Sequence, residues 1–136
     1  MKRVRAIIIE DKKVLTIKRT KPETIYWAIP GGGVEDDETN KQALIREAKE
    51  EMGLDIEVKE LFLEMNSKKL ETKGQKEYFY NCKIIGGKLG SGNGPEFEID
   101  TKYIGKYDIE WLDIKDLNDF DLKPPEIKKF IYNKYK

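Results

Sequence analysis

Residues 29–54 read IPGGGVEDDETNKQALIREAKEEMGL and carry the clearest pattern in the chain. Pro30 and the three glycines after it predict a tight loop, because proline fixes its own φ angle and glycine easily adopts positive φ angles. Thr39 followed three residues later by Gln42 is a capping-box pattern, and Gly53 stands where a left-handed residue ends a helix. The roughly 13 residues between these signals are mostly good helix formers. The stretch therefore predicts a glycine loop followed by a helix.

The predicted helix has one apolar face and one acidic face. At about 100° per residue, four apolar side chains share an arc that we expect to face a core. These side chains are Leu44, Ile45, Ala48 and Met52. Glu47, Glu50 and Glu51 share another arc, with Arg46 at its edge. Carboxylates at this spacing repel one another by a few tenths of a kcal/mol per pair, so a divalent cation bound through oxygen is a natural partner. A solvated surface face is the alternative explanation of this acidic run.

The glycines and the acidic residues stand at fixed distances, as G-x5-E-x7-R-E-A-x-E-E-x-G-L over residues 32–54. This pattern resembles the Nudix box, the signature of the Nudix (MutT-like) hydrolases. The fixed positions of the motif are occupied by Gly32, Glu38, Arg46, Glu47, Glu50, Glu51 and Gly53. A match at every fixed position is far more specific than a lone glycine motif. The resemblance implies the Nudix fold of the α/β class, an α/β/α sandwich with a mixed β-sheet and a catalytic loop and helix.

Length and composition narrow the class of protein. We expect one domain over residues 1–136, because 136 residues are enough to bury a core. The 26 basic and 26 acidic side chains cancel, so we expect no general binding of nucleic acids or membranes. Histidine is absent, which removes the commonest general base and zinc ligand. Cys82 is the only cysteine and the N-terminal apolar run is short, so we expect a cytoplasmic protein without a leader or a membrane span.

Alternation and turn residues predict the other elements of the chain. The predicted strands are Val4–Ile9, Val14–Lys18, Ile25–Ile29, Asp55–Met65, Gln75–Ile85 and Ile104–Leu112. The predicted loops are Thr20–Thr24, Asn66–Gly74 and the glycine-rich Gly86–Pro95, which is either a flexible connector or a lid. A helical turn at Ile114–Leu117 precedes a terminal amphipathic helix over Glu126–Tyr135, with Ile127, Phe130 and Ile131 on its apolar face. Strands around two helices predict a mixed sheet with helices on its faces.

The residues of the motif suit the cleavage of a phosphoanhydride. That reaction needs neutralisation of the polyphosphate, an in-line water and a base, and Mg²⁺ or Mn²⁺ held by carboxylates would provide the first. The resemblance implies that Glu50 and Glu51 are the principal metal ligands, that Glu47 is a ligand or the general base, and that the Gly32 carbonyl is a further ligand. It also implies that Arg46 positions these carboxylates by ion pairing.

Two further residues of the motif have structural roles. By the same resemblance, Glu38 braces the junction between loop and helix, and Gly53 ends the helix. Some members of the family use a glutamate outside the box as the base. Glu96, directly after the glycine-rich loop, is the first candidate for that base, and Glu98, Glu77 and Glu64 are weaker ones.

The resemblance implies hydrolysis of a nucleoside diphosphate linked to a second moiety X. Candidates for substrate contact are Arg19, Trp27 and the backbones of Gly31 and Gly33. A solvated strand end for Arg19, and a core or pocket wall for Trp27, are the alternatives. The additional sequence motifs of the subfamilies that cleave ADP-ribose, dinucleoside polyphosphates or coenzyme A are not evident. A (deoxy)nucleoside triphosphate is therefore the expected substrate. A non-catalytic module that senses a nucleotide or nucleotide sugar is the alternative function, and a homodimer stays open.

Overall fold

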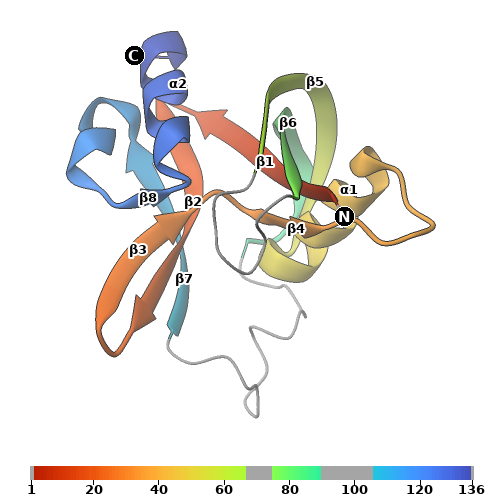
Figure 1. Cartoon of the computed structure of the whole chain (residues 1–136), viewed down its shortest axis with the longest axis horizontal. Helices are drawn as coiled ribbons and strands as arrows, with labels where there is room; N and C mark the ends of the chain where they lie inside the picture. The colour runs from red at the N-terminus through yellow and green to blue at the C-terminus, as the bar shows by residue number, and fades with distance from the viewer. Residues whose placement is uncertain (1, 67–74, 90–105, 136) are drawn as a thin grey trace. The chain divides into compact units, whose positions relative to one another are not determined.

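The computed structural model describes residues 2–66, 75–89 and 106–135, which divide into two compact units (Figure 1). The first unit contains the described residues from 2 to 8 and from 30 to 89. The second contains those from 9 to 29 and from 106 to 135. The single domain over residues 1–136 stays a prediction.

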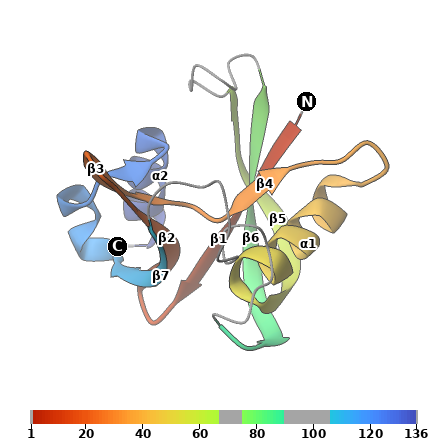
Figure 2. The same ribbon diagram turned by 90° about the horizontal axis from the view of Figure 1, so that it is seen from below.

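The first unit is built on a mixed sheet (Figure 2). Its strands are β1 (Lys2–Glu10, of which the part up to residue 8 lies here), β4 (Gly31–Gly33), β5 (Leu54–Asn66) and β6 (Lys76–Gly87). β1 runs parallel to β6 on one side and antiparallel to β4 on the other, and β5 pairs antiparallel with β6. The predicted combination of parallel and antiparallel strands is therefore confirmed.

Helix α1 (Asn40–Met52) begins and ends at the residues that the sequence indicates. The Gln42 backbone N–H donates to Thr39 Oγ1 at 3.1 Å, and the Thr39 N–H donates to Gln42 Oε1 at 2.9 Å. Gly53 ends the helix with a φ of 76°, in the left-handed region where a side chain would be strained. The predicted capping box and C-terminal glycine are confirmed.

The buried face of α1 differs from the predicted apolar arc. Ala43, Leu44, Ala48 and Met52 are buried, but the side chain of Ile45 is 45% exposed. At about 100° per residue, the buried arc begins at Ala43, passes Glu47 and Glu51, and ends at Met52. Ile45 lies just beyond Met52, outside this arc. The helix contacts β4 as well as β5, and this second contact draws two glutamates into the packed face. The expectation that Ile45 faces a core is wrong.

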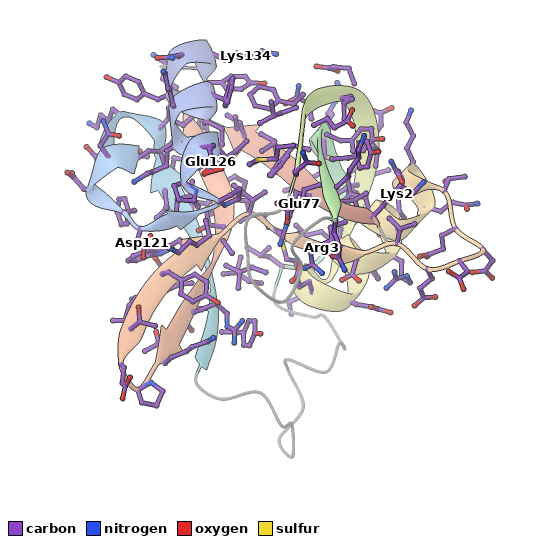
Figure 3. The ribbon with its side chains drawn as sticks, in the orientation of Figure 1. Lys2, Arg3, Glu77, Asp121, Glu126 and Lys134 are labelled. Carbon is purple, nitrogen blue, oxygen red and sulfur yellow. The ribbon has the colours of Figure 1, made fainter. Side chains whose placement is uncertain are left out.

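The two faces of the first sheet differ in chemistry. The Asn40 side chain donates to the Tyr80 hydroxyl at 3.2 Å, which places α1 over the face that carries Tyr80. The alternate residues of β1 and β6 therefore point to the face opposite α1. That face carries the buried polar residues of this unit, Arg5, Glu77 and Asn81, which are 7%, 4% and 8% exposed. Figure 3 shows Glu77 beside Arg3.

The glycine stretch is a strand rather than a loop. Gly31–Gly33 pair antiparallel with Arg3–Arg5 of β1, although three glycines in a row predict a loop. Gly31 has a φ of 155°, and a Cβ atom there would collide with the Val4 carbonyl oxygen. Glycine is thus required at position 31 by the close approach of two backbones, and the prediction of a loop is wrong.

The second unit is a largely antiparallel sheet. The end of β1 pairs with β2 (Lys13–Lys21), which also pairs with β3 (Thr24–Ala28) and with β7 (Lys106–Asp113). A short strand, β8 (Leu122–Lys123), runs parallel to β3. The 3₁₀ helix η3 (Ile114–Asp119) lies between β7 and β8 in the chain, and α2 (Pro125–Tyr135) follows β8. The two helices contact each other.

Two predicted loops are shorter than expected. β2 continues to Lys21 and pairs with Thr24, so the predicted loop at Thr20–Thr24 shrinks to a turn at Pro22. β6 continues through Gly86 and Gly87, so the predicted connector or lid cannot begin at residue 86. From residue 90 on, that segment lies outside the described residues, as do most of the predicted loop at Asn66–Gly74 and the first residues of the strand expected from Ile104.

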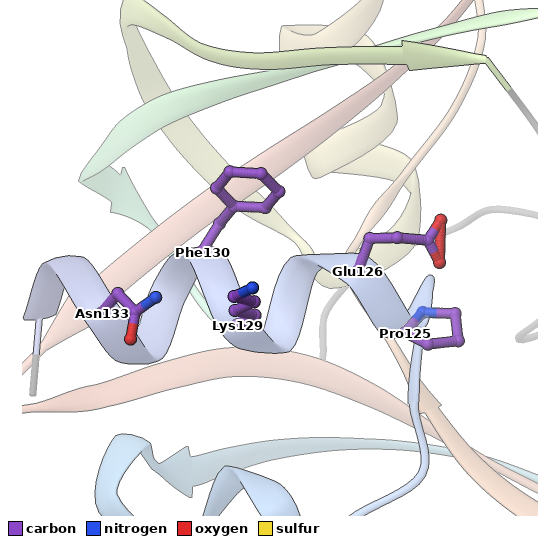
Figure 4. Close-up of a pocket in the computed structure, with 5 residues that line it drawn as sticks. All are labelled: Pro125, Glu126, Lys129, Phe130 and Asn133. Atoms are coloured by element: carbon purple, nitrogen blue, oxygen red, sulfur yellow. The ribbon is translucent and has the colours of Figure 1, made fainter.

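Helix α2 buries Ile127 and Ile131, as predicted, but Phe130 is 47% exposed. Phe130 lines an open pocket together with Pro125, Glu126, Lys129 and Asn133 (Figure 4). The prediction that Phe130 belongs to the packed face is wrong, because that face is narrower than the sequence pattern. In the part of the chain that the structure describes, no helix is long and apolar enough to cross a membrane.

Replacing Leu44 or Ile45 tests which side of α1 is packed. Leu44 is 1% exposed, so Leu44→Ala should lower the free energy of unfolding by about 2–5 kcal/mol. Ile45→Ala should change it by about 0.5 kcal/mol or less, because the side chain is largely in solvent. Urea denaturation of both variants measures the difference. Equal losses would contradict the assigned buried face.

Candidate active site

Arg46 on α1 holds together the acidic residues of the motif. Its Nε and Nη2 atoms donate to the two oxygens of Glu38 at 2.7 and 2.9 Å, a bidentate pair. Its Nη1 atom donates to Glu47 Oε1 at 3.0 Å and to Glu50 Oε2 at 3.2 Å. Nη2 also donates to the Gly33 carbonyl oxygen at 3.1 Å. One guanidinium group therefore joins the helix, the residues before it and β4.

The charges in this cluster stabilise one another. Hydrogen bonds to Glu38 are the largest cause that raises the pKa of Arg46, against a smaller opposing effect of burial. The hydrogen bond from Arg46 is likewise the largest cause that lowers the pKa of Glu38. Because charge-assisted bidentate bonds fix direction as well as distance, they hold the Arg46 guanidinium in one orientation. Glu47 and Glu50 receive their hydrogen bonds from a fixed donor.

Two glutamates lie against the backbone of the glycine strand. A Cβ atom on Gly32 would lie 2.5 Å from Glu47 Oε1, so the Glu47 carboxylate rests directly on the Gly32 Cα. The Gly31 N–H donates to Glu51 Oε1 at 2.9 Å. Carboxylates from successive turns of α1 thus lie side by side along β4, and the absence of side chains on β4 allows this.

The possible ligand atoms at this site are of the type that a hard divalent cation prefers. Glu47, Glu50 and Glu51 offer only carboxylate oxygens from one side of the helix, as Mg²⁺ and Mn²⁺ prefer. Among the described residues no three acidic, histidine or cysteine side chains are arranged closely enough to enclose an ion. Arg46 Nη1 stands between Glu47 and Glu50 and accounts for part of that spacing. These three glutamates are the residues that would hold a metal, with the Gly32 carbonyl as the predicted further ligand.

The substrate-contact candidates in the second unit are engaged by neighbouring side chains. The Arg19 guanidinium lies over the Tyr107 ring, 3.9 Å from its centroid. Trp27 Nε1 donates to Glu110 Oε1 at 3.0 Å, and the ring packs edge-on against Phe120. Both residues are partly exposed, and their contact with substrate stays a prediction.

The candidates for a base outside the motif fall into two groups. Glu96 and Glu98 lie outside the described residues, so their assignment stays a prediction. Glu77 is buried and accepts a hydrogen bond from Arg5 at 3.3 Å, and Glu64 accepts one from Lys76 at 3.2 Å. Both carboxylates are thus already engaged by a basic side chain, and a role for either as the base stays the weaker prediction.

Arg3 and Arg5 are not among the site residues predicted from the sequence. Both lie on β1 two positions apart, so they share a sheet face, and both contact Glu77. The sequence signal was an Arg-x-Arg alternation at the start of an otherwise apolar strand, which could have been interpreted as a cationic face.

A model of the NUDIX domain matches residues 1–133. The chain belongs to the Nudix family. Members of this family typically use divalent metal ions. The α/β class with a mixed sheet agrees with its fold. The site described above is the Nudix box of this member, and it comes from two elements of the first unit, β4 and α1 with the residues that precede it.

Several Nudix proteins of known name resemble this chain. Nucleoside triphosphatase NudI of Escherichia coli is 33% identical over 123 residues, which cover 85% of this chain and 84% of that protein. The ADP-ribose pyrophosphatase of Methanocaldococcus jannaschii is 39% identical over 92 residues, and these cover 66% of this chain and 54% of that protein. The putative nudix hydrolase 1 of Caenorhabditis elegans is 35% identical over 109 residues, or 79% of this chain, which spans only 26% of that protein.

Solved structures show the same fold at lower identity. A UDP-X diphosphatase superposes with a TM-score of 0.72 at 21% identity, over 98% of this chain and 61% of that one. The MutT of Aliivibrio salmonicida and Vibrio cholerae gives a TM-score of 0.66 at 21% identity, over 98% of both chains. At this level of identity, both similarities show a common fold.

Replacing Gly32 tests whether Glu47 must rest on a bare backbone. Gly32→Ala should displace the Glu47 carboxylate, since the new methyl group would stand 2.5 Å from it. We expect the rise in melting temperature on adding Mg²⁺ to shrink in Gly32→Ala. Gly33→Ala is the matched control, because a Cβ there has no atom within 4 Å. An unchanged Mg²⁺ response in Gly32→Ala would contradict the arrangement.

Lowering the pH should weaken the bond between Glu38 and Arg46. The folded pKa of Glu38 lies below its ordinary value of 4.5, so its stabilising effect is present above that value and is lost as the pH falls through the folded pKa. The melting temperatures of wild type and Glu38→Gln should differ most above about pH 5.5 and converge at lower pH. Thermal unfolding between about pH 3 and pH 7 measures this, and a gap that grows on acidification would refute it.

Proposed function

We propose that the chain is a pyrophosphohydrolase that cleaves the linkage of a nucleoside diphosphate bound to X, with a (deoxy)nucleoside triphosphate as its preferred substrate. The observation that carries the proposal is the Arg46 cluster. It holds Glu47 and Glu50 by hydrogen bonds, while the β4 backbone holds Glu51. A sensing module has no need of three acidic side chains fixed in this way, whereas a metal-assisted hydrolase does.

The substrate class rests on the similarity to named relatives. One E. coli relative, of which this chain covers 84%, is named a nucleoside triphosphatase. A second E. coli relative, 42% identical over 59 residues, is named a CTP pyrophosphohydrolase. The relative named for ADP-ribose is covered over about half of its length. We therefore favour a nucleoside triphosphate over ADP-ribose.

The chain's own residues would act by position and charge. Glu47, Glu50 and Glu51 would hold Mg²⁺ or Mn²⁺, which when bound neutralises the polyphosphate and acidifies a water molecule. Arg46 holds Glu47 and Glu50 in place by ion pairs. A carboxylate, of Glu47 or Glu96, takes the proton of the attacking water. The oxygen of that water bonds to phosphorus as the anhydride bond breaks, and pyrophosphate or phosphate-X leaves.

The composition supports the remaining parts of the proposal. Burial raises the pKa of the Cys82 thiol to about 12, so this single cysteine is held as an inert thiol, in keeping with a cytoplasmic protein. The balanced charge supports a small nucleotide as the partner rather than a long nucleic acid. Whether two chains form a homodimer is open to measurement by sedimentation.

A release assay for phosphate and pyrophosphate tests the proposal. It would cover canonical and oxidised dNTPs, ADP-ribose, nucleotide sugars, dinucleoside polyphosphates and 5′-triphosphorylated RNA, each with Mg²⁺ and Mn²⁺. Turnover of one triphosphate well above the others supports both the reaction and the class. Turnover of ADP-ribose alone would overturn the substrate class. Nucleotide binding without any turnover would favour the sensing module.

Removing one charge from the acidic cluster should abolish most of the turnover. Glu50→Gln and Glu51→Gln should each lower kcat/KM by about a hundredfold or more, because a neutral amide is a poor ligand for Mg²⁺. Both should stay folded, as checked by circular dichroism. Glu57→Gln is the control, since Glu57 is exposed on β5 and pairs in register with Lys83, away from the cluster. Activity near wild type in both variants would exclude this cluster as the metal site.

A further inference from the structure

Arg3 lies at the edge of the buried polar face of the first sheet. Its neighbours in register are Glu77 on β6 and Gly33 on β4. Arg3 Nε is 3.7 Å from Glu77 Oε1, and Arg5 Nη2 is 3.3 Å from the same oxygen. The side chains of Arg5 and Glu77 are 8% and 5% exposed, whereas that of Arg3 is 24% exposed. Arg3 is thus the member of this group that a ligand can reach.

The group carries more positive than negative charge. Two guanidinium groups approach one carboxylate oxygen, and the closer of them, that of Arg5, donates a hydrogen bond to it. The Nε atom of Arg3 is buried and has no hydrogen-bond partner among the described residues, and its 3.7 Å contact with Glu77 Oε1 is an ion pair too long for a hydrogen bond. A guanidinium group has five N–H donors, and a buried donor without a partner is costly. An anion placed against Arg3 would remove this cost.

Open space adjoins Arg3 on the same face. Directly opposed residues of an antiparallel pair point to the same side of a sheet, so Arg3 and Gly33 share a side. In the described part of the chain, a Cβ atom built on Gly33 meets no atom within 4 Å. The strand that separates Arg3 from the Nudix-box carboxylates consists only of glycines. Nothing on β4 fills the space in which a ligand of this cation would lie.

Arg3 also lies within the electrostatic field of the box. Burial is the largest cause that lowers the pKa of Arg3, and Arg5 adds to it, while Glu77, Glu47 and Glu51 act in the opposite direction. A divalent ion bound to Glu47 and Glu51 would cancel their share of this stabilisation. The Arg3 guanidinium group would then be stabilised by a new anionic partner, which an arriving polyphosphate provides. Binding of metal and binding of phosphate are thereby expected to be coupled.

We propose that Arg3 is an anion-binding residue of this site, which donates hydrogen bonds to a phosphoryl oxygen of the nucleotide in the open space beside Gly33. Glu77, held by Arg5, orients the guanidinium group. The role in catalysis rests on the proposed function, but the binding of phosphate by Arg3 does not. The alternative is a purely structural ion pair between β1 and β6, which would affect stability alone.

The test is the affinity of the full-length chain for inorganic pyrophosphate, measured by calorimetry with and without Mg²⁺. Arg3→Gln should weaken binding about ten- to a hundredfold in the presence of Mg²⁺, the loss expected for charge-assisted hydrogen bonds. Arg3→Lys, which keeps the charge without the planar fork, should recover part of the affinity. Lys2→Gln is the matched control, because Lys2 is the exposed neighbour on β1 and points to the other face (Figure 3).

A second variant keeps the test valid if Arg3→Gln does not fold. Gly33→Val fills the open space and leaves both arginines in place; Gly33 has no positive φ angle, and valine suits a strand. It should retain its melting temperature and lose pyrophosphate affinity. Unchanged affinity in Arg3→Gln, or in Gly33→Val, would overturn the proposal. An equal loss in Lys2→Gln, or no pyrophosphate binding by the wild-type chain, would do the same.

The outcomes separate this inference from the proposed function. A chain that binds pyrophosphate through Arg3 but cleaves no nucleotide supports the inference and refutes the hydrolase. A chain that cleaves a triphosphate with the same KM in Arg3→Gln and wild type retains the hydrolase and refutes the inference. A raised KM with a kcat near wild type supports a contact with the ground-state phosphate. A loss of stability alone identifies a structural ion pair.

Discussion

The close approach of α1 to the backbone of β4 is the constraint on which the site depends. Glu47 rests on the Gly32 Cα and Glu51 accepts from the Gly31 N–H, which no strand with side chains on that surface would allow. The same approach turns part of the acidic face of the helix into a packed face. Repulsion between neighbouring carboxylates is then balanced by Arg46 rather than by solvent. The fold holds these acids together at an energetic cost that a bound cation would relieve.

Local signals explain what the sequence could predict. The ends of α1 follow from Thr39, Gln42 and Gly53, because caps act within one turn of the helix. The Nudix box could be found because its roles require fixed residue types at fixed spacing. The errors come from tertiary contacts. Ile45 is exposed since β4 occupies a neighbouring side of the helix, and three glycines form a strand because β1 lies against them.

The arginines of β1 show why part of the site could not be predicted. Arg3 and Glu77 are 74 positions apart, and only the parallel pairing of β1 with β6 makes them neighbours. Periodicity within β1 indicates a shared face for Arg3 and Arg5 but gives no partner for either. A sequence motif records residues that act from one segment. A cation contributed by another strand, across a long separation, leaves no local pattern.

The carboxylates of the Nudix box and the arginines of β1 form two complementary groups of charge. The box gathers negative charge on the helix side of β4, and β1 gathers positive charge on the opposite face of the sheet. β4 carries no side chains, so none of its side chains would stand between a metal ion bound to the box and a phosphoryl oxygen bound to Arg3. Each charge partly stabilises its counterpart before a ligand arrives, which limits the cost of keeping both partly buried. A glycine strand is thus required twice, once for the approach of the carboxylates and once for the space left to a phosphate.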